Sequence, residues 1–89
     1  MDNITLLSML ARNIRGLRIE KQMNQREVVD ALGNIFSDKA LSCYESGKRE
    51  IPVIILYRLA ELYGVTIDEL FHEIPRIAWA DNVWGVKPK

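Results

Sequence analysis

The stretch from Asn24 to Arg49 constrains the fold of this chain most, because it holds two helix starts and two helix stops in close succession. Asn24 can cap a helix with its side-chain oxygen, and Glu27, three residues later, can reach back to the free backbone N–H of Asn24. Gly33 is suited to end this helix, since glycine readily adopts the left-handed conformation that often follows helices. The stretch is therefore predicted to begin with a short capped helix.

A second short helix is predicted after a turn formed by residues 34–36. Ser37 can cap this helix, Leu41 and Tyr44 lie three residues apart on one face, and Gly47 can end it. The pattern thus favours two short helices joined by a turn.

The same stretch resembles the helix-turn-helix DNA-binding domains of the phage-repressor and Cro family, also called the Xre type. The resemblance covers roughly residues 9 to 72. It rests on Asn24-Gln25, Leu32-Gly33, Ser37, Tyr44-Glu45, Ser46-Gly47-Lys48-Arg49, Ile51-Pro52, Leu59-Ala60, Gly64-Val65 and Asp68-Glu69-Leu70. It implies an all-α fold: a compact five-helix, lambda-repressor-like domain over residues 1–73, with a short C-terminal extension over residues 74–89.

An amphipathic first helix is predicted from a cap at Asn3 to near Gln22, because apolar residues recur every three or four positions. Arg18 interrupts the apolar face of this helix. The resemblance implies that Arg18 pairs with Glu45 and ties the first helix to the third. The alternative is a surface arginine whose aliphatic stem lies along the apolar face.

The composition fits one small domain with a single core, since 48% of the 89 residues are hydrophobic. Twelve basic and twelve acidic residues cancel, so bulk charge cannot hold nucleic acid to this chain. Residues 1–49 carry eight Lys or Arg against six Asp or Glu, and residues 50–89 carry four against six. This mild asymmetry supports DNA binding only weakly.

Several classes of site and location are not expected. A single cysteine and a single histidine allow neither an internal disulfide nor a Cys/His metal site. The apolar start is too short to span a bilayer, and its charges have the wrong order for a secretion signal. We expect a soluble, cytoplasmic protein that is not an enzyme and has no cofactor, metal or evident small-molecule ligand.

The third helix is the expected recognition helix, whose first turns enter the major groove of double-stranded DNA. By match to the family, the residues that face the bases are Asp38, Lys39, Ser42 and Cys43. Lysine can donate to guanine, aspartate can accept from cytosine, and serine can do either. Asp38 is the weakest of these candidates, because an acid near phosphates is repelled and because it can instead stabilise the helix N-terminus.

Phosphate contacts are expected on both sides of this helix. The candidates are Gln25, Ser37, Ser46, Lys48 and Arg49. Gln25 and Ser37 belong to helix starts, where backbone N–H groups favour anions, while Lys48 and Arg49 place two cations in the following loop. Cations in a loop are also often simply solvated.

Two departures from the family pattern make the base contacts uncertain. The family usually keeps a small residue at the position of Val29, where the third helix crosses closely. From Gly33 to Glu45 this chain runs twelve steps where ten are usual. The longer turn can make room for valine, but the angle of the third helix does not follow from the sequence.

Beyond the motif, Pro52 and Gly64 bound a fourth helix, and Thr66 with Glu69 forms a capping box that predicts a fifth. The fourth helix begins with an apolar collar that one small core does not need. We expect a homodimer held by Val53, Ile54 and Ile55 of this collar together with Trp79 and Trp84 of the extension. The extension can alternatively fold back on its own subunit.

The sequence therefore predicts sequence-specific binding of double-stranded DNA by a transcriptional regulator. The resemblance implies a repressor of a bacterial prophage, mobile element or antitoxin-type operon. The competing hypothesis is a protein-interaction module that keeps the fold but has lost DNA contact, which zero net charge, Asp38 and the apolar collar favour.

Overall fold

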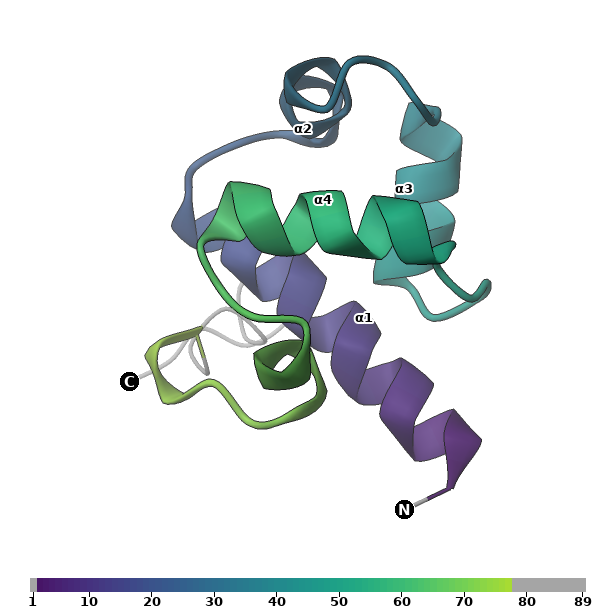
Figure 1. The fold of residues 1–89 in the computed structure, drawn as a ribbon, viewed down its shortest axis with the longest axis vertical. Helices are drawn as coiled ribbons and strands as arrows, with labels where there is room; N and C mark the ends of the chain where they lie inside the picture. Colours follow the sequence, from purple (N-terminus) through teal and green to yellow (C-terminus); the bar gives the residue numbers. More distant parts are fainter. Residues whose placement is uncertain (1, 78–89) are drawn as a thin grey trace.

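The computed structural model describes residues 2–77, which form four α-helices and two short 3-10 turns. The helices are α1 (Asn3–Glu20), α2 (Gln25–Ala31), α3 (Asp38–Glu45) and α4 (Val53–Tyr63), and the 3-10 turns are Asp68–Phe71 and residues 75–77. In Figure 1, α1 runs diagonally behind α4, and α2 and α3 lie beyond α4 at one end of the molecule. Trp79 and Trp84 lie outside the described residues.

The helix starts follow the sequence closely, with one exception. The capping box of Asn24 and Glu27 is present, with both hydrogen bonds at 2.8 Å, and the Ser37 hydroxyl accepts from the Ala40 N–H at 3.0 Å. The predicted cap at Asn3 is wrong. Asp2 caps α1 by accepting from the Thr5 N–H at 2.7 Å, and this hydrogen bond lowers the pKa of Asp2.

All four α-helices end in the same way. In each, a residue just beyond the helix donates its N–H to the carbonyl five positions back: Met23 to Arg18 (3.2 Å), Asn34 to Val29 (3.0 Å), Lys48 to Cys43 (3.0 Å) and Val65 to Ala60 (3.1 Å). The residue immediately before each donor is left-handed: Gln22, Gly33, Gly47 or Gly64. Gln22 is therefore the one helix end of the four built without glycine, at φ 61°.

The core lies between α1 and the other elements. Its fully buried side chains are Ile14, Leu17, Val28, Val29, Leu41, Leu59, Leu70 and Ile77. Val29 is completely inaccessible, so the larger residue at this position is accommodated beside the longer turn. Ile74 and Ile77, at the start of the predicted extension, are part of the same core.

The predicted fifth helix is wrong. Thr66 and Glu69 do form their capping box, but the segment that follows is only a 3-10 turn at Asp68–Phe71. Asn13, which is fully buried in α1, donates from Nδ2 to the carbonyls of Leu70 (2.7 Å) and His72 (2.8 Å). The backbone at His72 is extended (φ −128°, ψ 166°), so the helical conformation ends at this residue.

Within residues 2–77, no helix combines the length and apolar character needed to cross a lipid bilayer.

Candidate nucleic-acid interface

The two faces of α3 differ sharply in exposure. Leu41 and Tyr44 are buried against the core, and Ala40 lies beside them. Lys39 and Ser42 are exposed, while Asp38 and Cys43 are half-buried. All four residues predicted to face the bases thus remain at least partly accessible, and Lys39 and Ser42 are the most accessible of them.

A buried ion pair fixes the far end of α3. Arg18 of α1 donates from Nε and Nη2 to the two carboxylate oxygens of Glu45 at 2.7 and 2.9 Å. Both side chains are less than a tenth exposed. Arg18 also donates from Nη1 to the carbonyl of Met23 at 3.0 Å, so one guanidinium joins α1, α3 and the segment before α2. The pair that the family resemblance implied is present.

The electrostatics of this pair extend to Tyr63 of α4. Burial opposes the charge of Arg18, but the hydrogen bond and negative charge of Glu45 outweigh this and raise the pKa of Arg18. Burial, and then the charge of Glu45, raise the pKa of the Tyr63 hydroxyl well above its ordinary value. The Tyr63 hydroxyl is buried and has no hydrogen-bonding partner within residues 2–77.

Gln25 lies next to this pair. Its Nε2 donates to Oε1 of Glu45 at 3.1 Å, and the side chain is half-buried. The structure therefore gives this predicted phosphate contact a partner inside the domain. A hollow of about 160 Å³ opens beside it, lined by Arg15, Arg18, Gln25, Ser42, Glu45 and Ser46.

The loop after α3 presents the predicted cations. Gly47 is left-handed at φ 76°, and Lys48 closes the end of α3 by donating its N–H to the carbonyl of Cys43 at 3.0 Å. The hydroxyl of Ser46 donates to the same carbonyl at 3.2 Å. The side chains of Lys48 and Arg49 are exposed on this closed loop.

Sequence reasoning missed the role of Arg26. From α2 this residue contacts Asp30 one turn later, Asn34 in the turn and Asp38 at the first position of α3. The spacing of Arg26 and Asp30 predicts their pairing. The contact with Asp38 depends on the path of the longer turn, which the sequence does not give.

The collar on α4 divides between core and surface. Val53 is 68% and Ile54 64% exposed, and Tyr57 beside them is 52% exposed. Ile55 is only 8% exposed because it packs into the core, so it is not available as the interface residue that the sequence predicted. A shallow hollow of about 540 Å³ runs from Ile54 to Ile35 in the turn between α2 and α3.

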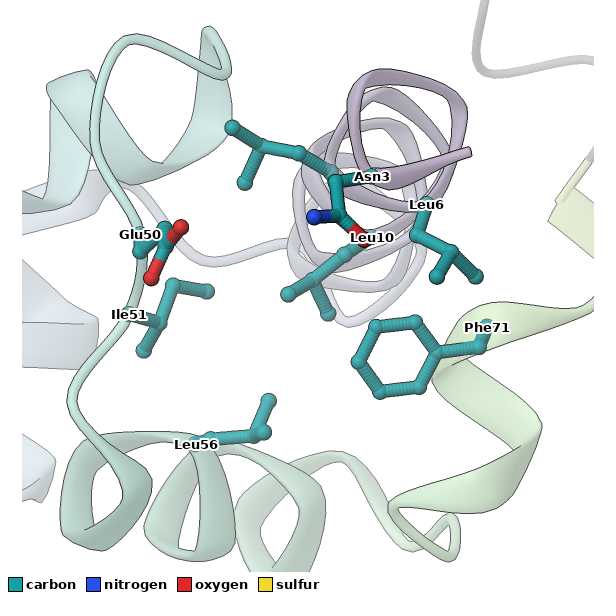
Figure 2. A pocket seen from close by; sticks show the side chains of 8 residues that line it. Asn3, Leu6, Leu10, Glu50, Ile51, Leu56 and Phe71 are labelled. Atoms are coloured by element: carbon teal, nitrogen blue, oxygen red, sulfur yellow. The ribbon is translucent and has the colours of Figure 1, made fainter. Parts of the chain in front are cut away.

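An apolar pocket of about 220 Å³ lies between the first turns of α1 and the start of α4. Figure 2 shows Leu10, Leu56 and Phe71 pointing toward one another across it, with Glu50 at its edge.

Among the described residues no cluster of His, Cys, Asp and Glu could hold a metal ion. His72 is exposed, and its Nε2 lies 3.5 Å from Oδ2 of Asp68.

An α-helical domain with two short helices joined by a turn, the second of them exposed on one face and anchored by a buried ion pair, is the architecture expected of helix-turn-helix regulators, and comparison with known proteins agrees. A family model described as "Helix-turn-helix" matches residues 14–70, well over half of the chain. The chain belongs to this Xre-type helix-turn-helix family of transcriptional regulators, which are not enzymes.

Two curated relatives are similar over 62 residues, or 70% of this chain. The "Cryptic phage CTXphi transcriptional repressor RstR" of Vibrio cholerae is 36% identical, and the match spans about half (54%) of that protein. The "Uncharacterized HTH-type transcriptional regulator y4dJ" of Sinorhizobium fredii (strain NBRC 101917 / NGR234) is 42% identical over 78% of its length.

A solved structure has a similar fold. The S. venezulae BldD DNA-binding domain superposes with a TM-score of 0.65 at 25% identity, over 75% of this chain and 97% of that one.

Proposed function

We propose that this protein is a sequence-specific repressor that inserts α3 into the major groove of double-stranded DNA. The proposal is carried by the exposure of Lys39 and Ser42 on the outer side of a helix whose inner side is fixed by Arg18 and Glu45. Lysine and serine are side chains that can recognise base edges in the major groove. A helix held rigidly at its far end can present them in a constant register.

Phosphate contacts would come from the loop after α3. Lys48 and Arg49 are exposed there, and the closed helix end positions their backbone. Ser46 shares this loop, and the N-termini of α2 and α3 at Gln25 and Ser37 offer backbone N–H groups. With no net charge on the chain, these local contacts must supply the attraction to the DNA backbone.

We further propose that the regulated genes belong to a prophage, mobile element or antitoxin-type operon. The support is the similarity to a relative named as a transcriptional repressor of a cryptic phage. Since the match spans about half of that protein, repression of such genes is a proposal for this chain.

A homodimer is proposed as the DNA-binding form. One recognition helix contacts too few base pairs to select a site in a genome, whereas two helices about 34 Å apart can recognise successive turns of one groove. The exposed Val53 and Ile54 on α4 provide an apolar surface for the second subunit. Trp79 and Trp84, outside the described residues, are proposed to extend it.

Selection of bound fragments from a random double-stranded library tests this function. The proposal expects one enriched sequence with two related half-sites, and binding that weakens as salt rises. Enrichment of no sequence would refute sequence-specific recognition.

The second candidate is a protein-interaction module on the same fold. It is favoured by the three exposed apolar side chains of α4 at zero net charge. Such a module would bind no DNA even at low salt, yet it would still bind a protein partner through α4. The same library, tested at low salt, therefore distinguishes the two functions.

A further inference from the structure

The guanidinium of Arg26 connects α2 to the first residue of α3. Its Nη1 lies 2.8 Å from Oδ1 of Asp38, and its Nη2 donates to Oδ1 of Asp30 at 2.8 Å. Nε donates to the same oxygen of Asp30 at 3.1 Å, and Nη2 also contacts Oδ1 of Asn34. Nε and Nη2 thus donate hydrogen bonds to Asp30 and Asn34, while Nη1 forms an ion pair with Asp38 that lacks hydrogen-bond geometry.

These acceptors flank and include the turn that is longer than usual for the family: Asp30 lies near the end of α2, Asn34 in the turn and Asp38 at the start of α3. The turn begins with two successive left-handed residues, Gly33 at φ 79° and Asn34 at φ 58°. The Asn34 side chain contacts Arg26 while its N–H closes the end of α2 through the carbonyl of Val29. Arg26 therefore bridges the start, the middle and the end of the segment that sets where α3 begins.

The charges explain why this arrangement matters at a DNA surface. Asp38 is in the first turn of α3, the end that enters the groove, where a free carboxylate would be repelled by phosphates. At 2.8 Å from Arg26 this charge is partly offset, because the same guanidinium also pairs with Asp30 and the three groups together keep one net negative charge, while Lys39 beside Asp38 remains exposed. Asp38 can then stay at the helix start with less repulsion from the DNA backbone than an unpaired carboxylate would meet.

We infer that Arg26 and Asp38 form a clamp that positions α3 across the longer turn and withdraws Asp38 from base recognition. The clamp rests on the proposed DNA binding and assigns specificity to Lys39 and Ser42. Arg26 and Asp38 are then positioning residues. The opposing possibility is that Asp38 leaves Arg26 on binding and accepts a hydrogen bond from cytosine.

Amide hydrogen exchange of the whole chain without DNA tests the clamp itself. Arg26→Ala and Asp38→Ala should each speed exchange at residues 34–37 by about 2- to 5-fold, the range expected for partly exposed charge pairs. Arg58→Ala is the matched control, because it removes an equally exposed pair with Glu61 inside α4. Unchanged exchange at the turn in both test variants would overturn the clamp, whether or not the protein binds DNA.

Binding of the same variants to the selected sequence and its single-base variants tests the role. Arg26→Ala should weaken binding about 5- to 10-fold by uncovering the charges of Asp38 and Asp30, and adding Asp38→Ala should restore a clear part of this loss. Asp38→Ala alone should leave the preference at every base pair unchanged.

Two results would overturn the assignment of Arg26 and Asp38 as positioning residues. One is a loss of about tenfold or more in discrimination at a single base pair in Asp38→Ala, which would make Asp38 a base contact. The other is a double variant that binds no better than Arg26→Ala. If the wild type selects no sequence, the proposed function fails instead, and the exchange rates alone decide the clamp.

Discussion

Arg18 of α1 and Glu45 of α3 lie 27 positions apart and form a bidentate ion pair with hydrogen bonds of 2.7 and 2.9 Å. Both side chains are almost inaccessible to water, and Gln25 of α2 donates to the same carboxylate. Three helices therefore meet at one charged group. Because each charge is balanced within the domain, loss of one partner leaves the other buried and unpaired.

Arg18→Ala is therefore predicted to destabilise the domain by about 3 to 5 kcal/mol. The measurement is the free energy of unfolding in urea. Arg58→Ala is the control, since its pair with Glu61 is about half exposed and should contribute less than about 1 kcal/mol. Equal losses in the two variants would show that the Arg18 pair is not desolvated in solution.

The buried hydroxyl of Tyr63 predicts a loss of stability at alkaline pH. Burial, and then the charge of Glu45, raise the pKa of Tyr63 in the folded state above its ordinary value of 10.0. The contribution of Tyr63 to stability is therefore fully present below about pH 10. It is lost progressively above this pH, because tyrosine in the unfolded chain releases its proton at a lower pH than the buried Tyr63 does. The loss approaches about 1.4 kcal/mol per pH unit.

Tyr63→Phe should flatten this alkaline decline without weakening the protein at pH 7, because the hydroxyl has no partner within residues 2–77. Tyr57→Phe is the control, since Tyr57 is 52% exposed. Thermal melts between pH 8 and 11 give the comparison. Parallel curves for wild type and Tyr63→Phe would contradict the raised pKa.

Gln22 at the end of α1 should be replaceable by glycine with a gain in stability. The left-handed conformation at φ 61° costs a non-glycine residue about 1 to 2 kcal/mol, and the greater flexibility of unfolded glycine offsets part of this. Gln22→Gly should raise stability by roughly 0.5 to 1 kcal/mol.

Gly64→Ala provides the opposite case, because Gly64 has φ 71° and no atom lies near its added methyl group. It should lower stability by about 1 kcal/mol through the backbone alone. Melting temperatures that move in the same direction for both variants would refute this account.

Caps were the most predictable part of the fold, because they depend on residues within one turn of each other. Asn24 with Glu27, Ser37, and Thr66 with Glu69 all make the bonds that their spacing predicts. The prediction of a fifth helix was wrong at a segment that makes a distant contact. Asn13, 57 positions before Leu70, donates a hydrogen bond to the carbonyl of Leu70. The sequence around Asn13 and the sequence around Leu70 give no local sign of this contact.

The candidate site, like the fold, was predictable only in part. The family match located the exposed face of α3 and the pair of Arg18 with Glu45. It did not reveal that Gln25 is held by Glu45, or that Arg26 reaches Asp38, since both depend on how α2 and α3 are placed. Ile55 was misassigned because the helical face on which a collar residue lies depends on packing.

The dimer predicts that Ile54→Glu will dissociate the protein. Ile54 is 64% exposed, so a charge there costs the folded monomer little, but it would be costly in an apolar interface. Sedimentation at micromolar concentration measures the effect. Ile4→Glu is the control, since Ile4 is 79% exposed on the first turn of α1.

Ile54→Glu should be monomeric and bind the selected DNA weakly, while Ile4→Glu should match the wild type. A wild type that is itself monomeric, with DNA binding unchanged in Ile54→Glu, would end the dimer proposal.

The central claim, that α3 recognises bases, is tested most directly by comparing Lys39→Ala with Lys48→Ala on the selected sequence, its single-base variants and random DNA. Lys39→Ala should cost about 1 to 3 kcal/mol on the selected sequence and flatten the preference at one base pair. Lys48→Ala should weaken binding to all sequences alike and reduce the salt slope by about 1. Equal, small losses for both variants on selected and random DNA would contradict the claim.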